Sequence, residues 1–284
     1  APQAGVGLVE VGLADRDAGA GVRHAEAWEI GDPITPRTAC VLYVAAPQSE
    51  PPLTEVVAVA HAHGVPVLVD AAAQLPPASN LRRFIAEGAD LVAFSGGKAI
   101  LGPQSSGILA GRRGMVQSAA LQMMDNDIWF QQWNPPASLF DKHLMKGLPQ
   151  HGIGRPCKVG KEQVVGLLVG LRRFVAEDPV SRHAAWLARL AEVQVALRAV
   201  NLLQITLVDR GPDAVPILET RLNEAAAGMK ALDAIIRLQD GNPSVHADPS
   251  GAKQGLIRFN PMGLKPGQGR IAGERLASVL TGRA

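Results

Sequence analysis

The chain has 284 residues, enough for one large domain and a smaller one, and its hydrophobic content of 47% is ordinary for a globular protein. A net charge of +2 with scattered basic residues argues against a nucleic-acid surface, and no apolar run is long enough to span a bilayer. The two cysteines lie far apart, which favours reduced thiols, and with no sign of a signal peptide we expect a cytoplasmic protein.

Apolar runs and glycines in the first half predict a mostly parallel sheet. Strand-like runs alternate with helical patterns that each end at a glycine, as in βαβ units. The last run follows Gly102-Pro103 with little room for a crossover helix, so we expect it to be antiparallel. The predicted strands are residues 6–11, 39–45, 65–71, 90–95 and 106–110, and the predicted helices are residues 52–63 and 80–87.

The second half predicts a different arrangement. Residues 115–152 are irregular and contain an aromatic, proline-rich stretch, 128–136, that we expect near the mouth of a site or at a subunit contact. A long helix with a broad apolar stripe is predicted from about 158 to 177. The remainder is typical of a small α+β domain, with helices at 181–199, 221–232 and 268–280 and strands at 203–208, 215–218, 244–248 and 255–259.

Two residues at predicted strand ends carry the most chemical information. Asp70 closes one apolar strand, and Lys98 follows the next. Ligands of open α/β sheets bind beyond such carboxyl ends. A lysine there can form a Schiff base with pyridoxal 5'-phosphate, while an acid holds a proton on the pyridine nitrogen so that the ring acts as an electron sink. The plainer alternatives are a solvated loop lysine and a helix N-cap.

The sequence around these residues resembles that of a known family. The stretches VDAAAQLPPASNL, GADLVAFSGGKAILGPQSSGIL and HGIGRPCKVGKEQVVGLL resemble the fold-type I pyridoxal-phosphate enzymes. They are most similar to the SelA-like group of L-seryl-tRNA selenium transferase-like and D-glucosaminate-6-phosphate ammonia-lyase-like proteins. The resemblance implies an α/β large domain with helices on both faces of its sheet (residues 1–155), a linker helix (156–178) and a small α+β domain (179–284).

The same resemblance implies that an N-terminal part of the large domain is absent. The family's large domain begins well upstream of Gly5, so we expect the phosphate cradle and an interior strand of the sheet to be missing. The chain would then carry the aspartate and lysine half of the cofactor site.

Three further residues are candidates for this site. Gln74 contacts the phenolic oxygen of the cofactor or caps a turn, and Ser95 donates to the cofactor phosphate or simply forms a turn. Arg155 binds a substrate carboxylate or is an exposed residue at a helix start. His61 and His63 face different sides of a helix end, so we expect structural or solvated roles and no metal site.

These residues predict an enzyme that acts at the Cα or Cβ of an amino acid, phosphorylated or not. The leading hypothesis is a lyase of the D-glucosaminate-6-phosphate ammonia-lyase type, with Lys98 moving the Cα proton. One alternative is a selenium transferase acting on seryl-tRNA, which the charge balance mildly disfavours. Another is a catalytically incomplete fragment that acts as an association partner. The resemblance implies a homodimer or higher homo-oligomer. The charge balance and the lack of a long apolar run argue against nucleic-acid and membrane partners.

Overall fold

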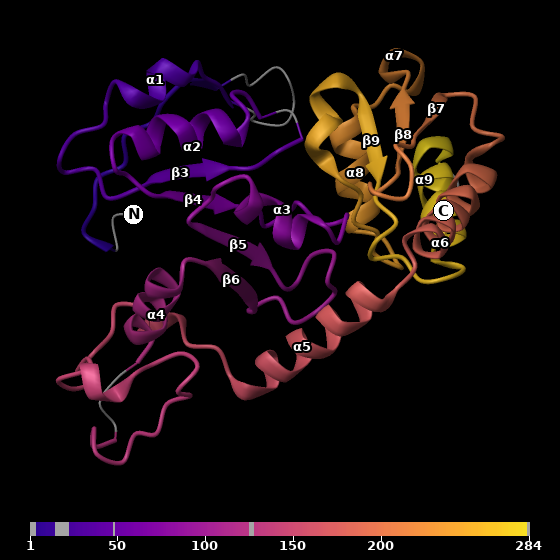
Figure 1. The fold of residues 1–284 in the computed structure, drawn as a ribbon. Coiled ribbons are helices and arrows are strands. Elements are labelled where there is room, and N and C mark those ends of the chain that lie inside the picture. The colour runs from indigo at the N-terminus through magenta and orange to yellow at the C-terminus, as the bar shows by residue number, and fades with distance from the viewer. Residues whose placement is uncertain (1–3, 15–22, 48, 125–127, 283–284) are drawn as a thin grey trace. The chain divides into compact units, whose positions relative to one another are not determined.

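The computed structural model describes residues 4–14, 23–47, 49–124 and 128–282 (Figure 1). These residues divide into two compact units, one that ends at Val175 and one that begins at Ala176. Each unit has its own cluster of buried apolar side chains. Within the described residues, no helix is long and apolar enough to cross a membrane.

The first unit is built on a four-stranded sheet. Strands β3 (Val41–Val44), β4 (Val67–Asp70) and β5 (Leu91–Ser95) are parallel, and β6 (Gly107–Gly111) is antiparallel to β5. The prediction of a mostly parallel sheet with a reversed last strand is confirmed. The four strands are neighbours in chain order. The expectation that an interior strand is missing between two of them is therefore wrong.

The predicted strand at residues 6–11 does not form. These residues are irregular, and Leu8 and Val9 are exposed. A two-residue ribbon follows, in which β1 (Leu13–Ala14) pairs with β2 (Arg23–His24). An apolar run becomes a strand only where a partner strand can pair with it, and in the described residues this run has none.

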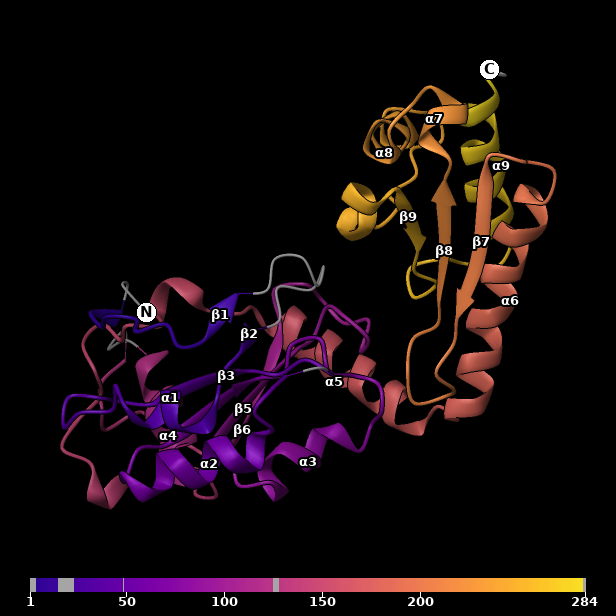
Figure 2. The same cartoon turned by 90° about the horizontal axis from the view of Figure 1, so that it is seen from above.

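The two faces of the main sheet differ in burial. Helices α2 (Leu53–Ala62) and α3 (Asn80–Ala86) lie on one side of the sheet (Figure 2), and α1 (Ala27–Gly31) packs on α2. The side chains of this face are largely buried, whereas their neighbours along each strand are half-buried or exposed, because successive side chains point to opposite faces. The buried set includes Val67, Val69, Val92 and Phe94, and the other set includes Leu42, Val44, Asp70, Ala93 and Leu109.

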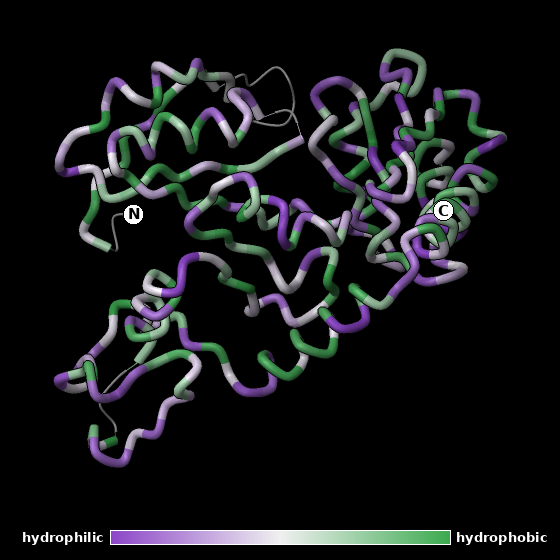
Figure 3. Tube along the Cα trace, viewed as in Figure 1, coloured by the Kyte–Doolittle hydropathy of each residue, from purple (hydrophilic) through white to green (hydrophobic). Residues whose placement is uncertain are grey.

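Beyond the sheet, the first unit continues through α4 (Arg113–Gln122), two short 3-10 helices, η2 (Lys142–Leu144) and η3 (Arg155–Cys157), and α5 (Lys161–Ala176). Leu167, Leu171 and Phe174 of α5 join the core, while Val164 and Leu168 stay exposed. The apolar stripe predicted for this helix, visible as green along α5 in Figure 3, therefore packs along only one edge.

The aromatic stretch between α4 and η2 packs mainly on itself. The rings of Trp133 and Phe140 have centroids 5.4 Å apart. The ammonium of Lys142 lies 5.1 Å from the ring centroid of Phe130 and donates to the carbonyl of Trp133. Trp129 by contrast is 76% exposed.

The second unit is an α+β arrangement. Strands β7 (Leu203–Val208), β8 (Ile217–Leu222) and β9 (Leu256–Phe259) form an antiparallel sheet in that order. Helices α6 (Pro179–Leu197) and α9 (Gln268–Thr281) pack closely against each other. The remaining elements are α7 (Glu224–Ala227), α8 (Ala231–Gln239) and the 3-10 helix η4 (Pro249–Gln254).

Two predicted elements of this unit are wrong. The helix expected at 221–232 is split, because β8 runs to Leu222, the Asn223 side chain caps α7 by accepting from Ala226 N–H, and Gly228 ends α7 in the left-handed region. The strand expected at 244–248 does not form. There, the hydroxyl of Ser244 donates to Gln239 O and Val245 N–H donates to Leu238 O, which closes the end of α8 instead.

Candidate functional site

The carboxyl ends of β4 and β5 bring two of the predicted residues to one face of the sheet. Asp70 is in register with Ala93 of β5, and Ser95 lies two residues further along the same strand. Because side chains alternate, Asp70, Ala93 and Ser95 point to the same, less buried face. One strand spacing and two residue steps put the Cα atoms of Asp70 and Ser95 roughly 8 Å apart.

The Asp70 carboxylate is half-buried and only partly engaged. Its Oδ1 accepts from Ala72 N–H at 3.0 Å, which forms a tight turn at the strand end. The backbone carbonyl of the same residue accepts from Ala45 N–H at 2.9 Å and so ties this turn to β3. Within the described residues, Oδ2 has no hydrogen-bond partner. It is therefore available to accept from a protonated ring nitrogen.

Lys98 projects from the loop that joins β5 to β6. Two backbone bonds hold this loop, Gly96 N–H to Ser106 O at 2.9 Å and Gly102 N–H to Gly96 O at 2.8 Å. Leu101 N–H donates to the carbonyl of Lys98, and Leu101 has a φ of +56°. The Lys98 side chain is exposed, and its ammonium makes no ion pair with the described residues. The backbone at Lys98 is thus fixed while the amine is unengaged.

These residues fit the ring half of pyridoxal phosphate. The cofactor needs an amine that can reach its aldehyde and an acceptor for its ring nitrogen. The Lys98 amine and the unpaired oxygen of Asp70 meet these needs, and both follow the carboxyl ends of adjacent strands. Ser95 offers a hydroxyl at the same edge.

Gln74 lies beside this edge, but its side-chain amide already donates to a backbone carbonyl. Its Nε2 donates to Ala45 O at 2.8 Å, and the backbone carbonyl of Gln74 accepts from Asn80 Nδ2 at 2.6 Å. These bonds link the turn after β4 to the end of β3 and to the start of α3. They favour the structural role over contact with a cofactor.

Arg155 is tied to α4 rather than to the strand ends. The segment before it is anchored by Gly152 N–H to Met124 O and by Gly154 N–H to Gln122 O, each at 2.8 Å. Because β6 is antiparallel to β5, it ends beside Leu91 at the amino end of β5. Helix α4 follows β6 and therefore begins at the end of β5 that is far from Ser95. Arg155 itself is exposed, and its role as a carboxylate ligand stays a prediction.

An ion cluster that the sequence analysis missed lies at the opposite edge of the sheet. The Asp90 carboxylate, 4% exposed, accepts from His61 Nε2 at 2.9 Å, from Val67 N–H at 2.7 Å and from Arg112 at 3.0 Å. Burial raises the pKa of Asp90, but these three hydrogen bonds outweigh it and hold that pKa below its ordinary value. The cluster ties α2, β4 and β6 together, which gives His61 a structural role. The one feature of the sequence that points to this ion cluster is an acid, Asp90, directly before an apolar strand.

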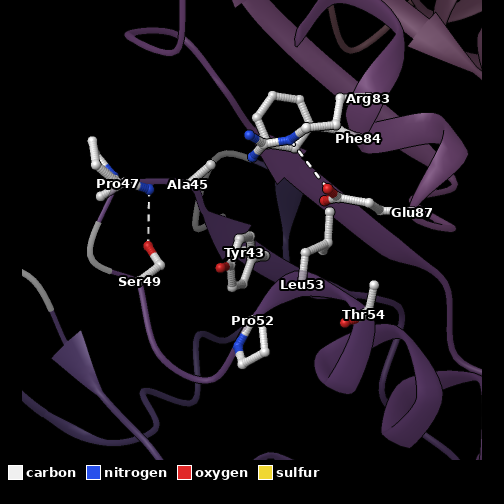
Figure 4. Close-up of a pocket in the computed structure, with 11 residues that line it drawn as sticks. Tyr43, Ala45, Pro47, Ser49, Pro52, Leu53, Thr54, Arg83, Phe84 and Glu87 are labelled. Atoms are coloured by element: carbon white, nitrogen blue, oxygen red, sulfur yellow. Dashed lines mark hydrogen bonds and ion pairs between the residues drawn. The ribbon is translucent and has the colours of Figure 1, made fainter. Parts of the chain in front are cut away.

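A hollow of about 260 Å³ lies beside the end of β3, on the side of α2 and α3 (Figure 4). Its wall includes Tyr43, whose pKa is raised chiefly by burial, and the ion pair of Arg83 with Glu87 at 3.1 Å. None of the predicted site residues lines it. It shares only Ala45 with the network around Gln74, and we assign it no ligand.

Comparison with known proteins identifies a family and several relatives that this chain resembles. Residues 1–126 match the family model described as SelA, L-seryl-tRNA selenium transferase. The chain is 31% identical over 258 residues to 5'-C-glycyluridine monooxygenase-decarboxylase of a Streptomyces species, a match that covers 88% of this chain and 56% of that protein. It is 27% identical over 260 residues to D-glucosaminate-6-phosphate ammonia lyase of Salmonella typhimurium, covering 90% and 61%. The chain thus spans little more than half the length of these relatives.

Solved structures agree with this assignment. A structure of D-glucosaminate-6-phosphate ammonia-lyase superposes with a TM-score of 0.67 at 26% identity and covers 98% of this chain and 65% of its own. A SepCysS–SepCysE N-terminal domain complex shows the same fold, with a TM-score of 0.54 at 14% identity, 99% of this chain and 70% of its own. This protein is therefore similar to the SelA family over residues 1–126 and has the architecture of the fold-type I pyridoxal-phosphate-dependent enzymes.

Proposed function

We propose that this protein acts at the Cα or Cβ of an amino acid and that its reaction is a β-elimination of the D-glucosaminate-6-phosphate ammonia-lyase type. The observation that carries the proposal is the placement of Asp70 and Lys98 after adjacent strand ends, each with an unengaged polar group. The sequence and structural similarity to that lyase supports the choice of reaction.

The chain's own residues would each do one task. Lys98 would hold the cofactor through its aldehyde, and the free oxygen of Asp70 would accept a hydrogen bond from the ring nitrogen. The bound cofactor supplies an electron sink that weakens the bonds at the substrate Cα. Lys98, released by the substrate amine, would remove the Cα proton and give a proton to the β-hydroxyl, which leaves as water. Hydrolysis at Cα of the unsaturated amine product would then release ammonia and leave a 2-oxo acid. Ser95 would donate to the cofactor phosphate. Arg155, whose segment is tied to α4, has no part in this scheme.

The names of the relatives share one chemical feature. The glucosaminate, glycyl and seryl groups in the names of the two relatives and of the family model are all α-amino acid groups, although the named reactions differ. This supports an amino-acid substrate more strongly than it supports any one reaction. Decarboxylation is the second candidate, because the relative with that name is 31% identical over most of the chain. It differs from β-elimination in needing no base to remove the Cα proton.

The experiment uses this difference. The protein is supplied with pyridoxal phosphate and D-glucosaminate 6-phosphate in heavy water, and ammonia, carbon dioxide and the position of deuterium in the product (Cβ after β-elimination, Cα after decarboxylation) are measured. Ammonia release that Lys98→Ala abolishes and Lys146→Ala leaves intact supports the lyase. Carbon dioxide released without ammonia favours decarboxylation. Cofactor binding with neither product contradicts both reactions for this substrate, and an absence of cofactor binding favours the association-partner alternative.

A further inference from the structure

The loop that carries Lys98 lies directly on helix α5, and two glycines of the helix make this possible. A Cβ atom placed on Gly170 would lie 3.0 Å from the carbonyl oxygen of Ile100 and 3.4 Å from the Cα of Gly102. A Cβ placed on Gly166 would lie 2.8 Å from Cγ of Pro103. These separations are shorter than the roughly 3.5 Å at which non-bonded carbon atoms pack best. A side chain at Gly166 would therefore force Pro103 to move, and one at Gly170 would require the loop backbone to shift by a few tenths of an ångström.

The contact is equally close from the side of the loop. A Cβ placed on Gly96 would lie 2.8 Å from the side chain of Leu167. A Cβ placed on Gly102 would lie 3.4 Å from the Cα of Leu167. Ile100 is buried in the same core cluster as Phe174 of α5. The loop is thus held against α5 on both sides of Lys98.

Two glycines inside α5 are unfavourable for the helix itself. Glycine is among the poorest helix formers, and alanine would be preferred at both positions if nothing packed there. Gly166 and Gly170 lie one turn apart on the face that meets the loop. Both face the loop that carries Lys98: Gly170 meets its backbone at Ile100 and Gly102, and Gly166 meets the ring of Pro103. The close approach of this loop is the physical reason for small residues at these two sites.

We propose that Gly166 and Gly170 are positioning residues for Lys98. By letting the loop backbone touch α5, they fix where the lysine begins and so set the reach of its amine toward the carboxyl end of β4. This inference rests on the proposed role of Lys98. Neither glycine touches the reacting atoms, and each acts only through the loop. A side chain at either position would push the loop from α5 and displace Lys98 from its place after the carboxyl end of β5.

The test compares Gly166→Ala and Gly170→Ala with Gly114→Ala. Gly114 lies in α4 with nothing within 4 Å of an added Cβ, so it controls for the gain in helix propensity. Each variant is treated with pyridoxal phosphate and borohydride, and the adduct on Lys98 is quantified by peptide mapping. We expect the adduct on Lys98 to fall about tenfold in the two α5 variants, because a displacement of 1 Å can cost about 100-fold in reactivity. Gly114→Ala should match the wild type.

A compensating substitution separates positioning from general damage. Pro103→Ala removes the ring atoms that the new Cβ at residue 166 would meet, so it should restore the Lys98 adduct in Gly166→Ala. It should not rescue Gly170→Ala, whose obstacle is the backbone oxygen of Ile100. Wild-type adduct levels in both single variants would overturn the proposal, and so would equal rescue of both by Pro103→Ala. If one single variant does not fold, the other and the Gly166→Ala/Pro103→Ala pair still decide.

A second readout keeps this test independent of the proposed function. Acetylation of Lys98 by acetic anhydride is measured without cofactor, relative to the exposed Lys253 of the second unit. The two α5 variants should change this ratio, and Gly114→Ala should not. If the wild type gives no cofactor adduct on Lys98, the proposed function fails, yet the acetylation ratio still tests whether α5 sets the position of Lys98. An unchanged ratio in both α5 variants would contradict the proposal.

Discussion

Asp90 gives the sharpest prediction for the stability of the first unit. Removing one member of a buried ion cluster costs about 3–5 kcal/mol when the partners are buried as well. Here the partners His61 and Arg112 are 44% and 68% exposed, so water replaces part of what they lose. We expect Asp90→Asn to cost about 1–2 kcal/mol, since the amide oxygen still accepts from Val67 N–H. Asp90→Ala leaves that buried N–H unpaired and should cost about 3 kcal/mol.

The pH dependence follows from the direction of the pKa shift. The pKa of Asp90 is lower in the folded protein than its ordinary value of 3.8. Its contribution is therefore fully present above that ordinary value and is lost as the pH falls through the folded pKa. The difference in stability between the wild type and Asp90→Asn should be largest near neutral pH and should shrink below about pH 4.

Urea unfolding followed by circular dichroism measures this difference at both pH values. Hydrogen exchange of the Val67 amide adds a local probe, because that N–H donates to Asp90 at 2.7 Å. Glu55→Gln, an exposed substitution on the same helix as His61, is the matched control and should change stability by less than about 1 kcal/mol. An Asp90→Asn variant as stable as the wild type, or a difference that does not shrink in acid, would refute the reasoning.

Three further predictions follow from the two units and the candidate site. Asp70→Ala should lower the rate of the cofactor-dependent reaction by orders of magnitude while some cofactor still binds, and unchanged turnover would exclude its pairing with the ring nitrogen. Leu276→Ala, at a fully buried position of the second core, should destabilise that unit by about 2–5 kcal/mol in a urea titration, and a loss below about 1 kcal/mol would contradict its core role. The active protein should be a homodimer in light scattering, and an active monomer would refute this expectation.

The sheet and the positions of Asp70 and Lys98 could be predicted because both depend on local pattern. Apolar runs of four or five residues, separated by helices that end in glycine, specify β3 to β5 in order, and the short return after Gly102-Pro103 specifies the reversed β6. The residues that close such runs must lie at the carboxyl edge. Nothing beyond neighbouring residues was needed to place them.

The errors arise where pairing partners outweigh the local pattern. Residues 221–232 have helical periodicity, yet β8 extends to Leu222 because it pairs with β7 and β9 and because the hydroxyl of Thr220 donates to Ile257 O. The run at 6–11 is apolar but pairs with no described strand. The single-sequence pattern cannot show which distant segment is available to pair.

Long-range side-chain networks were equally hidden. Asp90 accepts hydrogen bonds from His61 and Arg112, which are 29 and 22 residues away in the sequence. No sequence motif predicts these contacts. The amide of Gln74 is turned toward Ala45, 29 residues away, for the same reason. Gly166 and Gly170 disfavour the helix by their own propensity, and the reason for their small size lies in the loop around Lys98 that packs on them.

The most direct test of the central claim is covalent capture of the cofactor. The protein is mixed with pyridoxal phosphate, reduced with borohydride, digested and mapped by mass spectrometry, with Lys98→Ala as the control. We expect one modified peptide that carries the label on Lys98 and is missing from the variant. A label concentrated on any other lysine, or equal labelling of the wild type and Lys98→Ala, would contradict it.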